Sequence, residues 1–358
     1  MRLKKNSIYK LLFLSIIGSL NATGYWVKYG WEIFDHVTDA RTASLGNTII
    51  AYPISSMGGF IANPAFQFDN HSIVELTHQS RFAGMVNSDY VGFRKEIRKN
   101  VPVHFSILYE GIGKIPDTRS MLLDWGADGV FGTQDSGEGN GIIDEGERLN
   151  VDSIKYFSQH ILGLHGAFNK TWRQWQVGIG TKLLFHFIDD HHAIGIGLDL
   201  GFFRRFNGFN FGFVLRNIPS SGILWENGTI EGTLPNIDLG FNVPINMINY
   251  GLEFNPILSI RVNPYNRSFD SDIGFGTMSI DTVIGMECKY DNNLAVRIGR
   301  NPLGTMVGGI GISWKRISMD YGFLSEDSNS GLGNHLSLIH ISEPTRRYAI
   351  SYAVFCLK

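Results

Sequence analysis

The residues of this chain that are best suited to chemistry lie in an acidic, glycine-rich stretch, residues 124–147, which reads DWGADGVFGTQDSGEGNGIIDEGE. Calcium binds to several oxygen ligands on a flexible loop that glycine allows to turn sharply. The candidate ligands are Asp135, Glu138, Asn140, Asp144 and Glu147, with Asp124 and Asp128 nearby. We therefore expect a structural Ca²⁺ ion that stiffens this segment.

The second half of the stretch resembles an EF-hand or dockerin-type calcium loop. Asn140 precedes Gly141, an apolar residue follows two positions later, and Glu147 stands at the bidentate end position. The match departs from the pattern before Gly141, where one extra residue separates Asp135 from its expected place, and no flanking helices are evident. The alternative interpretation is an acidic, solvated loop without a metal.

A second cluster, Asp189-Asp190-His191-His192, has the residue types of a metal site. Because it lies between two strongly alternating segments, where polar turn residues are expected, a hairpin turn is the favoured interpretation. The chain has no G-x-S-x-G, H-E-x-x-H, P-loop or paired-cysteine motif. A barrel hydrolase with a dispersed serine–histidine pair would leave no motif, but nothing in the sequence favours an enzyme.

Strands with two unlike faces are expected to carry these loops. Large apolar residues alternate with glycine and polar residues over residues 176–185, 194–203 and 209–216. A period of two is typical of a strand, in a soluble sandwich as well as in a membrane barrel. These segments run for ~9–11 residues or more, as tilted membrane strands do, whereas globular strands average ~5–6 residues. Their length therefore favours a barrel.

About fourteen such segments can be counted. They begin near residues 72, 89, 101, 154, 175, 192, 208, 235, 248, 280, 294, 305, 316 and 334. The long connections, 111–152, 218–233 and 324–333, all follow odd-numbered strands, whereas those after even-numbered strands are short, as in outer-membrane barrels. The predicted fold class is all-β: a transmembrane antiparallel β-barrel over residues 71–335, with residues 111–152 as a long extracellular loop.

The N-terminus carries the features of an exported protein. Four basic residues among the first ten precede an apolar stretch and small residues that end near Ala22, which is the order of a secretory signal peptide. Residues 1–22 are assigned to this signal, and its apolar run is far shorter than the ~20 residues of a membrane helix. Residues 23–70 form an N-terminal segment whose glycine- and alanine-rich part, 40–68, is expected to plug the barrel. The expected location is a bacterial outer membrane, in contact with its lipid.

The composition agrees with this location. Charged residues make up 18% of the chain, below the ~25% of typical soluble domains, while 43% are hydrophobic. The formal net charge of −2 gives no reason to expect nucleic-acid binding.

Residues 336–358 do not continue the barrel pattern. Residues 336–346, LSLIHISEPTR, look like a translated transposase-type sequencing adapter, and residues 350–357, ISYAVFCL, look like a translated flow-cell adapter. A natural last strand should keep alternating, whereas Pro344 interrupts this one. We expect these residues to be non-native, so that a substitute strand must take the place of the natural last one. The alternative is a genuine final strand, and the encoding DNA distinguishes the two.

Two regions resemble the PorV/PorQ-like outer-membrane proteins. Residues 40–65, ARTASLGNTIIAYPISSMGGFIANPA, contain the family's "AR-x-x-x-(M/L)-G" and "NPA" motifs. Residues 284–302 and 308–335 contain "LA-x-R-x-G", "G-x-G-x-x-x-K-R" and "D-Y-x-F". The resemblance implies a FadL-like barrel of fourteen strands with an N-terminal hatch in the lumen. This chain departs from the family at residues 52–54, where small or acidic residues are usual.

The same resemblance implies a function. Some members of the family belong to the type IX secretion system, where the barrel receives secreted cargo that carries a C-terminal sorting domain. This implies a cargo-handling component with such cargo and other secretion-system proteins as partners. The alternatives are a FadL-like channel for hydrophobic small molecules and a structural or interaction barrel without transport. The predicted inward positions, mainly Gly, Asn, Lys, Asp and Arg with Phe203 as the exception, argue weakly against the channel.

Calcium binding by the acidic loop is expected to depend on Glu147. We expect the full-length protein in lipid nanodiscs to bind calcium saturably in the millimolar range or tighter, and Glu147→Gln to lose this binding, because the bidentate glutamate closes such a loop. Calorimetric titration measures both. Absence of saturable binding rules out the site, and binding that Glu147→Gln leaves unchanged rules out the assignment.

Overall fold

A computed structural model describes residues 30–345, apart from residues 36–38, 48, 55, 57, 68–71, 82–83, 99–100, 144–147, 266–270, 292, 301–303, 315–316 and 325–340. Within this part the chain is almost entirely β-strand, and the few helices are short. None of these helices has the length and apolar character needed to cross a membrane.

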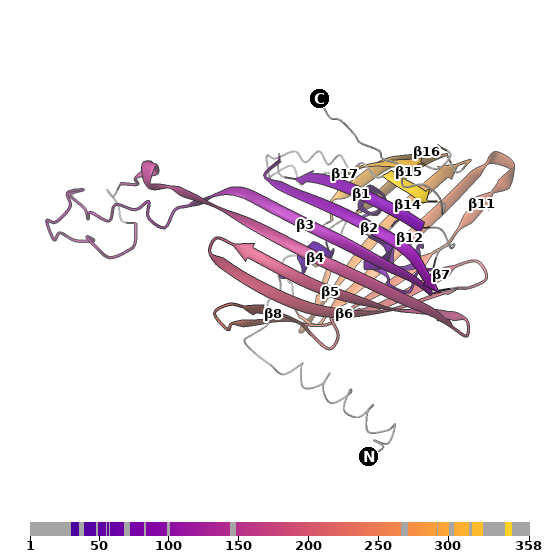
Figure 1. Cartoon of the computed structure of the whole chain (residues 1–358). Coiled ribbons are helices and arrows are strands. Elements are labelled where there is room, and N and C mark those ends of the chain that lie inside the picture. The colour runs from indigo at the N-terminus through magenta and orange to yellow at the C-terminus, as the bar shows by residue number, and fades with distance from the viewer. Residues whose placement is uncertain are drawn as a thin grey trace, which may run out of the picture.

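Fourteen strands of the described part form a continuous antiparallel wall. They are β1 (Ser72–Arg81), β2 (Val86–Arg98), β3 (Val101–Asp117), β4 (Lys155–Trp172), β5 (Trp175–Ile188), β6 (His191–Arg205), β7 (Asn210–Arg216), β10 (Asn236–Asn242), β12 (Leu252–Asn263), β14 (Met278–Tyr290), β15 (Leu294–Arg300), β16 (Met306–Trp314), β17 (Ile317–Leu324) and β18 (Ile341–Thr345). Each pairs with its predecessor in this order from β1 to β17, while β18 pairs with β1 and lies beside β17. Figure 1 shows these strands as the tilted wall of a barrel.

The remaining elements are short additions to this wall. The extra strands are β8 (Ser221–Trp225), β9 (Ile230–Thr233), β11 (Ile245–Met247) and β13 (Ile273–Phe275). The helices are α2 (Glu32–Asp35), α3 (Ala40–Ser44), α4 (Gly58–Ala62) and the 3₁₀ turns η1 (Ile49–Ala51), η3 (Val151–Ser153) and η4 (Ile248–Tyr250). The prediction of an all-β antiparallel barrel with about fourteen strands is confirmed.

The two faces of the wall differ as the alternation predicts. In β6, Ile194, Ile196 and Leu198 are 50%, 64% and 41% exposed, while Asp199 and Phe203 are fully buried. The same outward apolar face recurs in β14, β15 and β16. An apolar outer surface is what a membrane-spanning barrel requires.

The predicted start of the long connection at residue 111 and the predicted interruption of a strand at Pro344 were both wrong. The long connection begins only after Asp117, because β3 and β4 continue to pair beyond residue 111 across a register shift between Ile112 and Ile115. The resulting ribbon carries the described residues between 118 and 154 away from the barrel (Figure 1). Pro344 does not interrupt a strand either: it lies within β18, opposite Ile73 of β1. A proline removes only one backbone N–H donor from the strand, and the pairing of β18 with β1 continues on both sides of it. The origin of residues 336–358 stays a prediction.

The N-terminal segment lies against the inner face of the wall, as the predicted plug does. Helix α3 packs on β15, β16 and β17, η1 on β7, β10 and β12, and α2 on β3 and β4. Glycines of the wall make this approach possible. A Cβ atom at Gly240 would lie 2.8 Å from the amide nitrogen of Ala51, and one at Gly322 would lie 2.9 Å from the carbonyl oxygen of Ala40. The backbone of the plug thus takes the place of wall side chains.

Replacing Gly240 by leucine should therefore unseat the plug. The added side chain would overlap the backbone of η1, and overpacking of this kind typically costs about 1–3 kcal/mol of unfolding free energy. Urea unfolding in lipid vesicles measures this cost. Gly113→Leu is the matched control, because Gly113 lies in an exposed part of β3 and no atom would come within 4 Å of an added Cβ. Equal stability of the two variants would contradict the seating of the plug on glycine.

Candidate functional site in the barrel lumen

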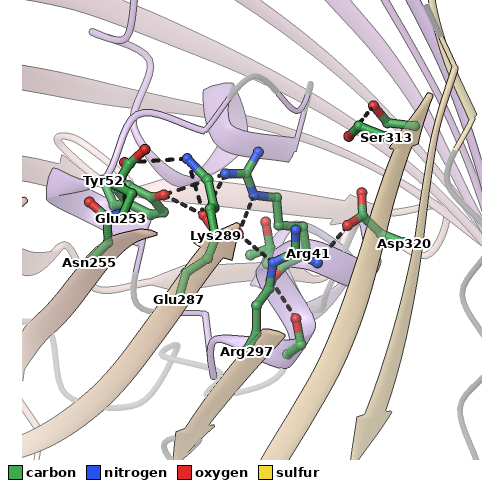
Figure 2. A network of polar contacts seen from close by, with 12 residues as sticks. Arg41, Tyr52, Glu253, Asn255, Glu287, Lys289, Arg297, Ser313 and Asp320 are labelled. Atoms are coloured by element: carbon green, nitrogen blue, oxygen red, sulfur yellow. Dashed lines mark hydrogen bonds and ion pairs between the residues drawn. The ribbon is translucent and has the colours of Figure 1, made fainter. Parts of the chain in front are cut away.

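A buried network joins the plug to the wall at Glu287 of β14 (Figure 2). Arg41 of α3 donates from Nε and Nη2 to the two carboxylate oxygens of Glu287, at 2.9 and 2.7 Å. This two-pronged geometry is the strongest that an arginine forms with a carboxylate. The Tyr52 hydroxyl donates to the same carboxylate. Burial raises the pKa of Tyr52 well above its usual value, so the hydroxyl keeps the proton that it donates.

The network continues along the wall. Arg297 of β15, which lies opposite Glu287 in the strand register, donates from Nε to Glu287 at 2.5 Å and from Nη1 to Asp320 of β17 at 2.5 Å. The Nζ atom of Lys289 lies 3.5 Å from carboxylate oxygens of both Glu253 and Glu287. Three cationic side chains thus face three carboxylates, with none in excess. The network is suited to holding the plug rather than to binding a charged ligand.

A second buried network lies across β5, β6, β7, β10 and β12. The Nζ atom of Lys182 lies 2.7 Å from Asp199, and Arg216 bridges Asp199, at 3.5 Å, to Asp238. Arg261 completes the row with a 2.7 Å bond from its Nε to Asp238. Burial of these charges is tolerable because each has an oppositely charged partner on the next strand.

Wall and plug also meet through backbone carbonyl groups. Arg216 donates to the carbonyl oxygens of Ile61 and Ala62 at 3.1 and 2.8 Å. Asn169 of β4 donates to the carbonyl oxygen of Phe66 at 2.7 Å. In the other direction, Asn63 of the plug donates to the carbonyl oxygen of Phe202 at 3.2 Å. These bonds satisfy carbonyl groups that irregular backbone leaves open in a buried place.

An apolar cluster fills the lumen beside α2 and α4. Its buried members are Trp31, Ile33, Phe34, Phe60, Ile61, Ala65, Phe66, Tyr90, Leu108, Ala167, Leu184, Ala193, Phe203 and Ile223, with Ile161 and Trp225 packed against them. The aromatic rings of Trp31 and Phe34 stack with centroids 5.8 Å apart, and Phe66 meets Phe203 edge-on at 5.3 Å. The cluster is formed jointly by the plug and by strands β2–β6 and β8.

Phe203 was predicted to be the one large apolar residue among the inward-facing positions, but the lumen contains several others. Leu108 and Leu184 are inward and fully buried as well, and Ile223 joins them from β8. The alternation of the strand could have identified Leu184, because it directly follows the outward-facing Leu183 and must therefore face inward. Glycine and charged residues dominate the inner wall by number, but the apolar ones are contiguous once the barrel is formed.

The acidic stretch lies at the end of the projecting ribbon. In its described part, each carboxylate accepts backbone N–H groups: Asp124 from Asn140 and Gly141 at 3.2 and 2.8 Å, Asp135 from Asp128 at 2.8 Å, and Glu138 from Gly132 and Gln134. Asp144 and Glu147 lie outside the described residues. Among the described residues no group of three or more His, Cys, Asp or Glu side chains is placed to hold a metal ion. Calcium binding stays a prediction.

The cluster at residues 189–192 is a hairpin turn between β5 and β6, as expected. Glu226, in the turn between β8 and β9, accepts a hydrogen bond from the backbone N–H of His192 and lies 2.5 Å from the Nδ1 atom of His191. These contacts hold the pKa of Glu226 below its usual range, the N–H of His192 contributing most. The carboxylate thereby ties the β8–β9 hairpin to the β5–β6 turn.

No protein-family model and no curated protein sequence matches this chain. Its fold is similar to that of the Pseudomonas putida toluene transporter TodX, with a TM-score of 0.51 and 10% identity over 87% of this chain and 99% of that one. The Ralstonia pickettii toluene transporter TbuX gives a TM-score of 0.47 at 10% identity over 85% and 96%. A Pseudomonas aeruginosa FadL homologue gives 0.44 at 12% identity over 86% and 96%. The likeness to TodX shows a shared fold, a FadL-like barrel; the finer resemblance to PorV/PorQ proteins stays a prediction.

Removing the charge of Arg41 should loosen the plug. Arg41→Met removes the only described cationic partner that the plug gives to Glu287, while Tyr52, Arg297 and Lys289 still contact this carboxylate. Because breaking one side of a buried ion pair typically costs about 3 kcal/mol when no other partner remains, we expect a loss of about 1–3 kcal/mol. Urea unfolding in vesicles measures the loss. Arg119→Met removes an ion pair of the same 2.7 Å length with Asp117, but in an exposed loop, and should leave stability nearly unchanged. Equal effects of the two substitutions would show that the network does not anchor the plug.

Proposed function

We propose that this protein is an outer-membrane channel for small hydrophobic molecules. The observation that carries the proposal is the apolar cluster in the lumen. Its members Ala193 and Phe203 lie near the two ends of β6, ten residues apart, and a strand rises by ~3.3 Å per residue. The two residues therefore lie ~33 Å apart along the strand, which at a tilt of ~40° corresponds to ~25 Å across the membrane, the height of the apolar band of such barrels.

The location follows from the outer face and the export signal together. The outward side chains of the wall are large and apolar, which favours lipid as their surroundings. A barrel satisfies its backbone hydrogen bonds internally, so it can stand in hydrocarbon without a transmembrane helix. The shared fold with TodX, a toluene transporter, supports both the membrane location and the class of molecule.

The division of the lumen supports a path along one side. The buried ion-pair networks lie on β5–β7, β10, β12, β14, β15 and β17, where they hold α3 and the end of α4. The apolar cluster lies mainly on β2–β6 and β8. A hydrophobic molecule that follows the cluster meets side chains such as Leu184 and Phe203. It passes beside the Lys182–Asp199 pair on β5 and β6 and displaces no ion pair of the Glu287 network.

A second candidate function is the handling of exported cargo, as the PorV/PorQ resemblance implies. The observation in its favour is the ribbon of β3 and β4, which carries the described residues between 118 and 154 away from the barrel and into reach of a partner (Figure 1). The test is the genome of the source organism: type IX components and cargo with sorting domains must be encoded there. If they are absent, this candidate fails, and if they are present, a pull-down from outer membranes must recover such cargo.

The channel is tested in a Gram-negative strain that lacks its own channel of this kind. Cells that produce the protein should take up radiolabelled toluene faster than cells without it. Leu184→Asn should lower the added rate about tenfold, since an unpaired amide in an apolar path costs ~1–3 kcal/mol. Ile142→Asn, in the exposed external loop, is the control and should not change the rate. Uptake equal to that of cells without the protein, despite a folded barrel in the membrane, contradicts the proposal.

A further inference from the structure

We infer that the lumen contains a subsite for one neutral hydrogen-bonding group, formed by His104 of β3 and His165 of β4. The inference rests on the proposed channel and names its preferred substrate class: a small apolar body that bears a hydroxyl group. Such a molecule differs from a plain hydrocarbon, which has no hydrogen-bonding group, and from a carboxylate, which is negatively charged.

The two imidazoles are the most completely buried histidines of the described chain, each 1% exposed. Neither ring nitrogen of His104 or of His165 has a hydrogen-bond partner there. A buried polar atom without a partner is costly, so four such atoms in one place are rare in a core that serves packing alone. A neutral imidazole offers one donor and one acceptor, which matches a hydroxyl group that also donates and accepts.

The strand register brings the two rings together. His165 lies opposite Ser106, two residues from His104 on the same inward face of β3. Diagonal neighbours of this kind are ~7–8 Å apart at the backbone, so one small group between the rings can reach both. Ser106 itself is already engaged, since its hydroxyl lies 3.0 Å from the hydroxyl of Tyr90.

The surroundings of the pair are apolar. Phe60 of the plug stacks over His104 with ring centroids 3.3 Å apart, and Ala167 of β4 lies opposite His104 in the register. Both belong to the apolar cluster, as does Leu108 on the same strand as His104. The imidazoles are thus a polar spot inside the proposed hydrophobic path, in reach of a substituent on a molecule whose body contacts the cluster.

The charges nearby favour a neutral group over an anion. Lys182, opposite His165, has its Nζ atom 2.7 Å from Asp199, and Arg216 is shared between Asp199 and Asp238. Arg94, opposite His104, is engaged in an interaction of its own, although its buried Nη1 atom makes no hydrogen bond and could also donate to a hydroxyl group. A carboxylate placed between the histidines would have to compete with these partners and with the nearby Asp199. A hydroxyl group needs no counter-ion.

Toluene, benzyl alcohol and benzoate test the inference, because they share one ring and differ in one substituent. Their binding to the full-length protein in nanodiscs is measured by calorimetry, with empty nanodiscs to correct for partition into lipid. We expect benzyl alcohol to bind about tenfold more tightly than toluene, as one or two net hydrogen bonds allow, and benzoate to bind more weakly than either. Equal binding of toluene and benzyl alcohol overturns the inference, as does tighter binding of benzoate.

Variants locate the effect. His104→Phe combined with His165→Leu should abolish the advantage of benzyl alcohol while toluene still binds, whereas His160→Phe, an exposed position on the same strand as His165, should keep it. The ligand series on the unmodified protein decides the matter even if the double variant does not fold. If toluene neither binds nor enters cells, the proposed channel fails. If toluene binds and the alcohol shows no advantage, only the histidine subsite fails.

Discussion

The structure depends on the direct contact between the backbone of the plug and the inner wall of the barrel. If both the plug and the inner wall carried side chains where they meet, their backbones would lie farther apart than a hydrogen bond can span. One of the two surfaces must therefore lack side chains at these positions. Wall glycines such as Gly212, Gly240 and Gly299 do so, and a Cβ atom at any of them would overlap the plug. Once the backbones touch, Arg216 and Asn169 reach plug carbonyl groups that would otherwise stay unpaired in a buried place.

The ion-pair networks follow from this contact and add specificity to it. Buried ion pairs contribute little net stability, because desolvation offsets most of the attraction, but a misplaced partner leaves a buried charge uncompensated. Arg41 fits Glu287 only if α3 lies against β15–β17, and Arg216 bonds α4 only if η1 lies against β7 and β10. The networks therefore penalise other seatings of the plug more than they stabilise the observed one.

The sequence predicted those features of the fold that depend on the two-residue period of strands and on the residue types that favour turns. The strand alternation, the hairpin at residues 189–192 and the all-β wall of about fourteen strands were confirmed, since each follows from residues close together in the chain. The pairing of Arg41 with Glu287 joins residues 246 positions apart and needs the register of the closed wall. Leu184 was overlooked for a related reason: it stands between the polar Lys182 and His186 on the inward face of β5, and it becomes part of a cluster only when β4, β5 and β6 lie side by side.

The ion-pair networks and the apolar cluster, which together fill the lumen, differ in how easily a hydrophobic molecule could displace them. An ion pair has a defined geometry, so displacing it exposes two charges to an apolar surrounding at high cost. Apolar side chains hold one another by many weak contacts without a preferred direction, and another apolar body can replace each contact. A hydrophobic molecule can therefore exchange places with parts of the cluster around Phe60 and Leu184, whereas the Glu287 network resists it. In the proposed channel, division of the lumen into an anchored side and an apolar side would let one short segment both fill the barrel and line a route through it.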